Sequence, residues 1–336
     1  MSRDTDRHGL PPRPGDDASP AAWRAYADAL EQVIAAGEHR GAFLQTRLNQ
    51  IVTSPAFKVL KKARSILQST RSSRRKKSAA ASYTPDIQGS PLVSILIPFR
   101  DQAAVLERCL KSLRAITAYS RYELILIDNG STETATKKLL ANEARNSNTQ
   151  VLRVDEPFNF SRLNNLAAKK AQGEHLLFLN NDTEIIDPVW LGALLEQSQK
   201  TAVGAVGAKL LYPDGRIQHA GVKMGMDDIA GHIHRLCTED DPAVQTMREC
   251  DAVTAACLMT RCGVFEELGG FNETDLPVAY NDVDYCLRVR EKNLKIIYTP
   301  HARLIHHESL SRGNTNDPRQ SAYMCRRWAR FILNGK

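Results

Sequence analysis

Polar side chains that could bind a cation or a phosphate follow three short apolar segments of the sequence. They form the runs Phe-Arg-Asp at 99–101, Asp-Asn-Gly-Ser at 128–131 and Asn-Asn-Asp at 180–182. Each run alone is typical of a turn or a helix N-cap, because Asn, Asp and Ser side chains bind backbone N–H groups in such places. Together the three runs predict a polar crevice, and a carboxylate such as that of Asp182 suits a hard divalent cation.

The segments around these runs alternate between strand and helix patterns. Short buried strands are predicted at 93–98, 122–128, 150–154 and 175–180, with helices starting near residues 106, 132 and 161. Strands that alternate with helices indicate an α/β fold with a mostly parallel sheet. Ligands of such sheets bind at the carboxyl ends of the strands, near a switch in strand order. We therefore expect the three polar runs to meet at one edge of the sheet.

The first predicted strand is not followed by a glycine-rich phosphate loop. The sequence FRDQAAVLERCL at 99–110 contains neither the dinucleotide-binding pattern G-x-G-x-x-G nor the P-loop pattern G-x-x-x-x-G-K-[ST]. It also lacks the glycine- and lysine-rich loop expected of a nucleotidyltransferase, which is the alternative enzyme class for this fold. A diphosphate bound at this edge would therefore need a divalent cation.

Eight sequence blocks between residues 91 and 315 resemble, in order, the family-2 glycosyltransferases that have the GT-A fold. The nucleotide-sugar half of that family is similar to the blocks VSILIPFRD, LILIDNGS, FNFSRLNN and HLLFLNNDTEI. The acceptor half is similar to the blocks KLLYPDGRIQHAGV, ELGGFNE, AYNDVDYCLR and LIHHESLSRG. The similarity is greatest to bacterial rhamnosyltransferase-like members that build O-antigens and other surface polysaccharides. It implies an inverting transfer of a sugar from a nucleoside diphosphate to a glycan or lipid-linked glycan, with Mg²⁺ or Mn²⁺ as cofactor.

The resemblance also implies which residues bind the donor. Asp128 would hold the base, and Pro98 and Arg100 would line the same pocket. Arg162 and Asn165, near the start of a predicted helix, are further candidates for donor contacts. Capping of that helix by the serine that precedes Arg162 is the competing interpretation.

The metal ligands implied by the resemblance come from two distant blocks. Asp182 matches the last acid of the family's D-x-D element, whereas Asn180 and Asn181 stand where acids are common. These three residues would contact the diphosphate, and Asp182 would also bind the metal. Since only one carboxylate is present there, a second ligand must come from elsewhere. His306 is the family's candidate and His307 the alternative, and a loop whose histidines only form hydrogen bonds is the structural interpretation.

The acid that would activate the acceptor lies in the block AYNDVDYCLR. Asp282 matches the second acid of the family's E-D element, and Asn281 replaces the first. Asp284 is rotated by about 200° from Asp282 around a helix, so we expect it to be structural. Lys209 and His219 flank a Tyr-Pro-Asp-Gly turn and are expected to serve local structure. A non-catalytic glycan-binding protein of the same fold would be expected to lose these acids.

The chain divides by composition into several parts. We predict a disordered tail at 1–20, a helical extension at 21–70, a basic linker at 71–90, the glycosyltransferase domain at 91–320 and a C-terminal helix at 321–336. The net charge of +7 comes from the extension and linker, because eleven lysines and arginines and no acid lie between Glu38 and Asp86. Two interpretations stay open: a solvated helix, or peripheral contact of residues 40–77 with an anionic membrane. Nucleic acid is not expected, since no recognition module accompanies the charge.

The location is predicted from what the sequence lacks. No apolar run approaches the roughly 18 to 20 residues that span a bilayer. The charged, proline-rich N-terminus has no apolar signal-peptide core. The seven cysteines form no C-x-x-C pair, which favours reduced, structural thiols. These features predict a cytoplasmic protein, at the inner face of the cell membrane if the basic segment binds lipid.

Overall fold

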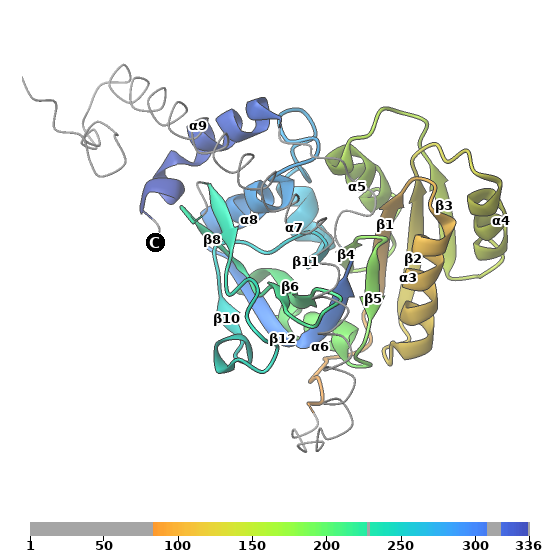
Figure 1. The fold of residues 1–336 in the computed structure, drawn as a ribbon, viewed down its shortest axis with the longest axis horizontal. Helices are drawn as coiled ribbons and strands as arrows, with labels where there is room; N and C mark the ends of the chain where they lie inside the picture. The colour runs from red at the N-terminus through yellow and green to blue at the C-terminus, as the bar shows by residue number, and fades with distance from the viewer. Residues whose placement is uncertain (1–82, 227–228, 308–316, 335–336) are drawn as a thin grey trace, which may run out of the picture. The chain divides into compact units, whose positions relative to one another are not determined.

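The computed structural model describes residues 83–226, 229–307 and 317–334. The chain separates into one unit of residues 1–82 and a second of residues 83–336, and every described residue belongs to the second. The predicted tail, the predicted helical extension and most of the basic linker therefore lie outside the described residues. Within the second unit, helices α4 and α9 lie at opposite ends of the ribbon (Figure 1).

Four parallel strands form the half of the sheet that the sequence predicts. They are β1 (Val93–Phe99), β2 (Tyr122–Asp128), β3 (Thr149–Arg153) and β4 (His175–Leu179). The chain runs outward from β1 to β2 and β3 and then returns to β4 on the other side of β1. This reversal of strand order lies between β1 and β4, so the predicted crevice at their carboxyl ends is where such folds bind ligands.

The helices between these strands follow from the spacing of apolar residues. They are α3 (Ala103–Ile116), α4 (Thr134–Glu143) and α5 (Phe160–Ala168). Helix α3 buries Leu106, Cys109, Leu110 and Leu113, which lie on one face at three- and four-residue steps. All residues of β1 and β4 are buried, as expected for strands covered on both faces.

The other half of the sheet is largely antiparallel, so the sheet as a whole is mixed. It contains β6 (Val203–Leu211), β10 (Arg248–Glu249), β11 (Cys257–Arg261) and β12 (Lys295–His306). Strand β11 is antiparallel to both β4 and β6, and β12 is parallel to β6. Two short strands join this half, β5 (Thr183–Ile185) beside β12 and β7 (Ile217–His219) beside β6. A separate two-stranded ribbon is formed by β8 (Val222–Met224) and β9 (Ala230–His232).

Helices cover this second half as well. They are α6 (Trp190–Ser198), η1 (Pro242–Val244), α7 (Cys262–Glu267), α8 (Asn281–Glu291) and α9 (Pro318–Asn334). Helix α8 begins at the block in which the sequence predicts the catalytic acid, and α9 begins three residues before the predicted C-terminal helix. The predicted fold class, an α/β fold whose sheet is flanked by helices, is therefore confirmed.

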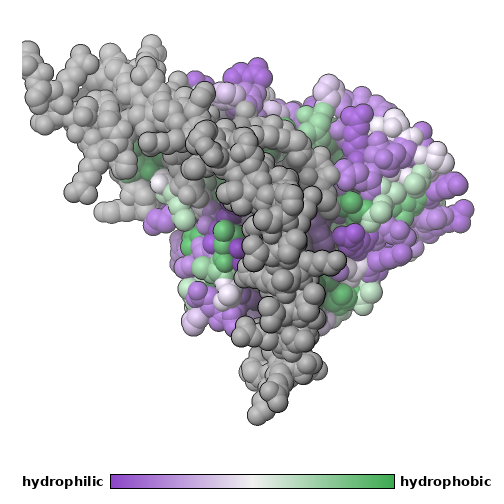
Figure 2. Space-filling view, viewed as in Figure 1, coloured by the Kyte–Doolittle hydropathy of each residue, from purple (hydrophilic) through white to green (hydrophobic). Residues whose placement is uncertain are grey.

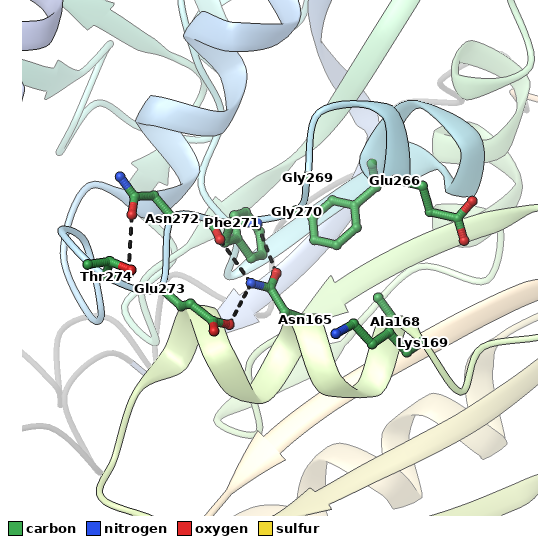
Figure 3. A pocket seen from close by; sticks show the side chains of 11 residues that line it. Asn165, Ala168, Lys169, Glu266, Gly269, Gly270, Phe271, Asn272, Glu273 and Thr274 are labelled. Atoms are coloured by element: carbon green, nitrogen blue, oxygen red, sulfur yellow. Dashed lines mark hydrogen bonds between the residues drawn. The ribbon is translucent and has the colours of Figure 1, made fainter.

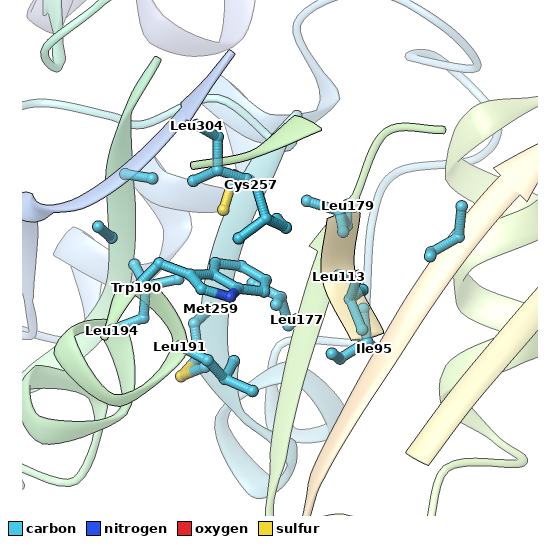
Figure 4. Packing of buried hydrophobic residues seen from close by; sticks show 14 of the residues in the cluster. Ile95, Leu113, Leu177, Leu179, Trp190, Leu191, Leu194, Cys257, Met259 and Leu304 are labelled. Carbon is cyan, nitrogen blue, oxygen red and sulfur yellow. The ribbon is translucent and has the colours of Figure 1, made fainter. Parts of the chain in front are cut away.

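One hydrophobic core joins the two halves of the sheet. Trp190 of α6 lies at its centre, among Leu177 of β4, Met259 of β11 and Leu304 of β12 (Figure 4). Leu177 and Met259 are register partners, so the core crosses the junction between the parallel and antiparallel strands. The Trp190 indole N–H donates to Thr117 Oγ1 at 2.9 Å, which satisfies its one polar group. One packed layer of hydrophobic side chains thus holds the parallel and the antiparallel strands together.

The part of the surface that is coloured in Figure 2 is mainly hydrophilic. The face drawn in Figure 2 carries polar residues with small, separated hydrophobic patches. Among the described residues no helix combines the length and the apolar character that a membrane span requires.

Candidate active site

Asp101 fastens the loop after β1 to the loop after β2. Its carboxylate accepts the backbone N–H groups of Thr132 and Glu133 at 2.8 and 2.9 Å, and its own N–H donates to Ser131 Oγ at 2.8 Å. The hydrogen bond from the Glu133 N–H is the main cause that lowers the pKa of Asp101 below its usual value. Asp101 has a φ of 53°, a left-handed conformation that these bonds hold in place. These hydrogen bonds therefore hold the two loops together at the carboxyl ends of β1 and β2.

Asp128 lies buried at the carboxyl end of β2, where it pairs in register with Phe99. Its Oδ1 accepts the Ser131 N–H at 2.8 Å and its Oδ2 accepts Arg153 Nη1 at 2.8 Å. Arg153 is about half exposed, with 45% of its side chain accessible, and it also pairs with Asp155. The strand-end rule could have identified Arg153, since it is the last residue of β3.

Pro98 lies near the carboxyl end of β1, which pairs with β2, and Arg100 directly follows β1. Pro98 is buried and pairs with Ile127 of β2, whereas Arg100 is exposed. The structure thus brings the three residues predicted for base binding, Pro98, Arg100 and Asp128, to one rim of the sheet. Their contacts with a donor stay a prediction.

Arg162 and Asn165 of α5 contact other residues of the protein. Arg162 pairs with Glu156, and its Nη1 lies 3.2 Å from Glu273 Oε1. Asn165 donates to the Phe271 carbonyl at 2.9 Å and to Glu273 Oε2 at 3.0 Å, and it accepts the Phe271 N–H at 2.9 Å. These bonds tie α5 to the 271–273 turn and show a structural use for both side chains. Their predicted donor contacts remain untested.

The N-cap of α5 is Asn159, not the predicted Ser161. Asn159 Oδ1 accepts the backbone N–H of Arg162 at 2.9 Å. The Ser161 hydroxyl instead donates to the Leu276 carbonyl at 2.6 Å. The competing interpretation, a cap by Ser161, is wrong because the N-cap lies two residues earlier and Ser161 falls inside the first turn of the helix.

A cavity of about 540 Å³ lies beside α5, α7 and the 269–274 turn. Figure 3 shows Asn165 bridging to this turn next to the cavity. Gly270 has a φ of 75°, and a Cβ there would lie 2.5 Å from Asn165 Oδ1, so only glycine allows this approach. The residues predicted for the base, the metal and the proton transfer are not among those that line this cavity.

Asp182 and His306 meet at the end of β4. Antiparallel pairing of β5 with β12 places Thr183 opposite His306, which brings Asp182 Oδ1 to 3.1 Å from His306 Nε2. Both side chains are buried. The imidazole of His307 lies instead 3.1 Å from Glu184 Oε2, because neighbouring residues of an extended chain point to opposite sides. The geometry therefore selects His306, not His307, as the histidine beside Asp182.

Two amide side chains contact the same imidazole. His306 Nδ1 lies 2.7 Å from Gln218 Oε1, and its Nε2 lies 3.2 Å from Asn180 Nδ2. Asn181, between Asn180 and Asp182, is also buried. Sequence reasoning missed Gln218, since nothing in its block indicates that β7 lies near the end of β12.

The Asp182–His306 pair fits a divalent cation. Two ligands at right angles, each about 2.1 Å from a metal ion, lie about 3.0 Å apart, close to the observed separation of 3.1 Å. An imidazole with a carboxylate suits Mn²⁺ better than Mg²⁺, which prefers oxygen ligands alone. Within the described ranges no group of three or more histidines, cysteines and acids forms a complete metal cage. Substrate oxygens and water would therefore have to complete the coordination.

Asp282 lies in the first turn of α8, close to the same strand end. Its Oδ2 accepts the Ala255 N–H at 2.9 Å, and its Oδ1 accepts the Val283 N–H at 2.8 Å. The neighbouring Ala256 carbonyl accepts the Asn180 N–H at 3.1 Å. The short backbone segment 255–256 thus connects Asp282 with Asn180, which contacts His306. Asp282 is partly buried, whereas Asp284 in the same turn is fully buried.

Asp284 is fully buried and serves the packing of α8, as expected. Its Oδ2 accepts the Arg288 Nε–H and its Oδ1 accepts the Trp328 indole N–H, both at 2.8 Å. The helical rotation between Asp282 and Asp284 therefore separates a partly buried acid from a fully buried, structural one.

Lys209 and His219 are buried as well and contact Gln245 and His232. Burial lowers the pKa of Lys209 to about 8 and that of His219 well below its usual value.

Residues 94–269 match the model of Glycosyl transferase family 2; this range contains Asp128 and Asp182 and ends before Asp282 and His306. The chain belongs to glycosyltransferase family 2. It is 44% identical over 231 residues to the O-antigen biosynthesis protein RfbC of Myxococcus xanthus, and 43% identical over 254 residues to protein y4gI of Sinorhizobium fredii. These matches cover 67% and 72% of this chain but only 18% and 28% of the two relatives. The chain therefore spans less than a third of either relative.

Solved glycosyltransferases share the fold at low sequence identity. The structure of GalNAc-T7 with UDP, GalNAc and Mn²⁺ has a TM-score of 0.57 at 16% identity, over 72% of this chain and 50% of that chain. The mannosyltransferase PcManGT of Pyrobaculum calidifontis with GDP-Man and Mn²⁺ has a TM-score of 0.51 at 15% identity, over 92% and 84%. The family and the GT-A fold are thus established together.

Proposed function

We propose that this glycosyltransferase transfers a sugar from a nucleoside diphosphate to a hydroxyl of a surface glycan or lipid-linked glycan, with inversion at the anomeric carbon. The observation that carries the proposal is the placement of Asp282. It is a partly buried carboxylate whose hydrogen-bond partners among the described residues are backbone N–H groups, and the short segment 255–256 joins it to Asn180, which contacts His306. A proton acceptor and a diphosphate site would then adjoin each other.

Asp282 would act as the general base. Each of its oxygens accepts one backbone N–H and retains a lone pair for an incoming hydroxyl. As the hydroxyl oxygen bonds to the anomeric carbon, its proton passes to Asp282 and the bond from that carbon to the diphosphate oxygen breaks. This single displacement inverts the anomeric centre. A positioned base of this kind contributes about 10²- to 10⁴-fold to the rate.

Asp182 and His306 would hold the cation that accompanies the diphosphate. Mn²⁺ or Mg²⁺ bound there would offset the charge that grows on the leaving group. Burial of the two ligands lowers the local dielectric, which would strengthen the attraction between the Asp182 carboxylate and the cation. The imidazole ligand favours Mn²⁺ of the two.

The base of the donor would lie on the rim formed by β1 and β2. Asp128 is held rigidly by Ser131 and Arg153, so its remaining lone pairs have fixed directions. Arg153 presents a partly exposed guanidinium, which is suited to pack against a planar base. Pro98 and Arg100 would contribute the adjoining wall.

The acceptor and the location are proposed from the relatives and from the charge of the sequence. The similarity to an O-antigen biosynthesis protein favours a surface-polysaccharide acceptor. A lipid-linked acceptor would suit a cytoplasmic enzyme that contacts the inner face of the membrane through residues 40–77, where basic residues are concentrated. Each basic residue near an anionic surface contributes about 1 kcal/mol to binding.

Vesicle binding tests this location. Five residues, Arg71, Arg74, Arg75, Lys76 and Lys77, are replaced by serine in the full chain. Loss of these charges should weaken binding to anionic vesicles by at least about tenfold, while binding to neutral vesicles should not change. Equal binding of both proteins to anionic vesicles would contradict the membrane contact.

A panel of nucleotide sugars tests the activity. Release of nucleoside diphosphate is measured for UDP-, GDP- and dTDP-sugars with glycan acceptors, with added Mn²⁺ and with EDTA. We expect one donor class to be consumed, activity to be lost in EDTA, and NMR to show an inverted anomeric centre. Retention of configuration would contradict the role of Asp282, and full activity in EDTA would contradict the cation. Donor binding without any transfer would instead support the glycan-binding alternative.

A further inference from the structure

We propose that Gln218 is a positioning residue that holds His306 in the tautomer required for cation binding. The inference rests on the proposed cation site at Asp182 and His306 but concerns a residue outside it. Gln218 lies at the centre of β7, and the pairing of β7 with β6 and of β6 with β12 brings it to the end of β12. Its side chain is buried, and its Oε1 lies 2.7 Å from His306 Nδ1.

The hydrogen bond sets the position of the ring proton. An amide oxygen can only accept, so His306 Nδ1 must carry a hydrogen and donate it to Gln218. In the neutral imidazole the lone pair is then on Nε2, the atom that faces Asp182 Oδ1 at 3.1 Å. Asn180 Nδ2, 3.2 Å from Nε2, can donate to the same lone pair. Both amides therefore favour a ring that presents Nε2 as a metal ligand.

Loss of the Gln218 oxygen would change the site without removing a ligand. A neutral His306 with no acceptor at Nδ1 would place its single proton on Nε2, where it can donate to Asp182 at 3.1 Å. That hydrogen bond would occupy both atoms that the cation needs and would have to break before the ion could bind. Gln218 thus favours the cation by making the competing arrangement unfavourable.

Burial supports a dedicated role for this amide. The Nε2 of Gln218 is buried and has no hydrogen-bond partner among the described residues. The side chain therefore pays the desolvation of an amide for its one side-chain bond, to His306. A leucine would fit a purely structural position of this kind at lower cost.

Two substitutions and a matched control test the inference. Gln218→Leu removes the acceptor, whereas Gln218→Glu keeps an acceptor oxygen at the same distance along the side chain. Gln197→Leu is the control, because Gln197 is also a buried glutamine but contacts Glu196 and Lys200. Thermal unfolding of each variant confirms that it folds.

The first readout is the affinity for Mn²⁺ alone, measured from the electron paramagnetic resonance signal of the free ion. Gln218→Leu should weaken binding by about 10- to 100-fold, the usual effect of removing the partner of a metal-bound histidine. Gln218→Glu and Gln197→Leu should stay close to the unmodified protein. Unchanged affinity in Gln218→Leu, or equal weakening in Gln218→Leu and Gln218→Glu, would overturn the proposal.

The second readout is independent of the metal and of activity. Nitrogen-15 NMR of the metal-free protein at about pH 8.5, where an ordinary imidazole is neutral, gives the tautomer of His306, whose signals are assigned by their loss in His306→Gln. We expect the proton on Nδ1 in the unmodified protein and on Nε2 in Gln218→Leu. A proton on Nε2 in the unmodified protein would overturn the inference. Failure of the unmodified protein to bind Mn²⁺ would contradict the proposed cation site, whereas the NMR result would still decide the role of Gln218.

Discussion

The two halves of the sheet position their polar residues in different ways. In the parallel half, Asp101 and Asp128 are fixed by partners only 31 and 25 residues away, in the loop after the next strand or at its end. At the junction with the largely antiparallel half, His306 of β12 contacts Asn180, after β4, and Gln218 of β7, across 126 and 88 residues. The first arrangement follows from local strand order, whereas the second depends on the register of strands that are distant in sequence.

This difference explains which side chains remain available for chemistry. The carboxylates of the parallel rim are occupied by arginine and backbone N–H groups, which suits the rigid binding of a donor base. At the junction of the two halves, Asp182 Oδ1 faces His306 Nε2, and Asp282 in the first turn of α8 is bonded to backbone N–H groups and is only partly buried. The proposed chemistry is therefore concentrated where the long-range register, not the local loop, determines the geometry.

The largest expected effect follows from removing the proposed base. Asp282→Asn keeps the size of the side chain and an oxygen for a backbone N–H, so folding and donor affinity should change little. Turnover should fall by about 10²- to 10⁴-fold, because an amide cannot take the proton of the acceptor hydroxyl. Single-turnover kinetics and donor binding are measured on the same sample. Normal turnover would show that Asp282 is not the base.

Asp284→Asn is the matched comparison on the same helix. The substitution weakens the buried pair with Arg288 and the bond from Trp328, so we expect a loss of about 3 to 5 kcal/mol in the free energy of unfolding. Turnover per folded molecule should be retained. Denaturant unfolding and active-site titration separate the two effects. The opposite pattern, with turnover lost in Asp284→Asn and kept in Asp282→Asn, would reverse the assignment.

A smaller, pH-dependent effect is expected from His175 of β4. Burial, with Arg261 nearby, lowers the pKa of His175 to about 4 in the folded protein. Between that value and the usual 6.5 the unfolded chain binds more protons, so stability falls as the pH falls through this window. His175→Asn, which can still bond Ser198, should remove about 2 kcal/mol of the loss between pH 6.5 and 5. An unchanged pH profile of unfolding would contradict the buried neutral state of this histidine.

The sequence predicted the parallel half well because its signals are local. The buried strands and their polar ends identify β1, β2 and β4 within one residue of their limits, and the same rule would have found Arg153. The structural role of Asp284 followed from helical rotation alone. Register between distant strands has no such signal: the family resemblance placed His306 before His307, but the residues alone could not rank them, and the contact with Gln218 was not predicted. The N-cap role of Asn159 was missed for a different reason, because helix limits cannot be predicted to better than a residue or two.

The most direct test of the central claim is the position of the bound cation. Crystals are grown with Mn²⁺ and the nucleoside diphosphate identified by the donor panel, and anomalous scattering locates the manganese. We expect one strong peak between Asp182 Oδ1 and His306 Nε2, about 2.1 Å from each atom. A peak at any other residues, or a bound diphosphate with no peak beside Asp182, would contradict the account.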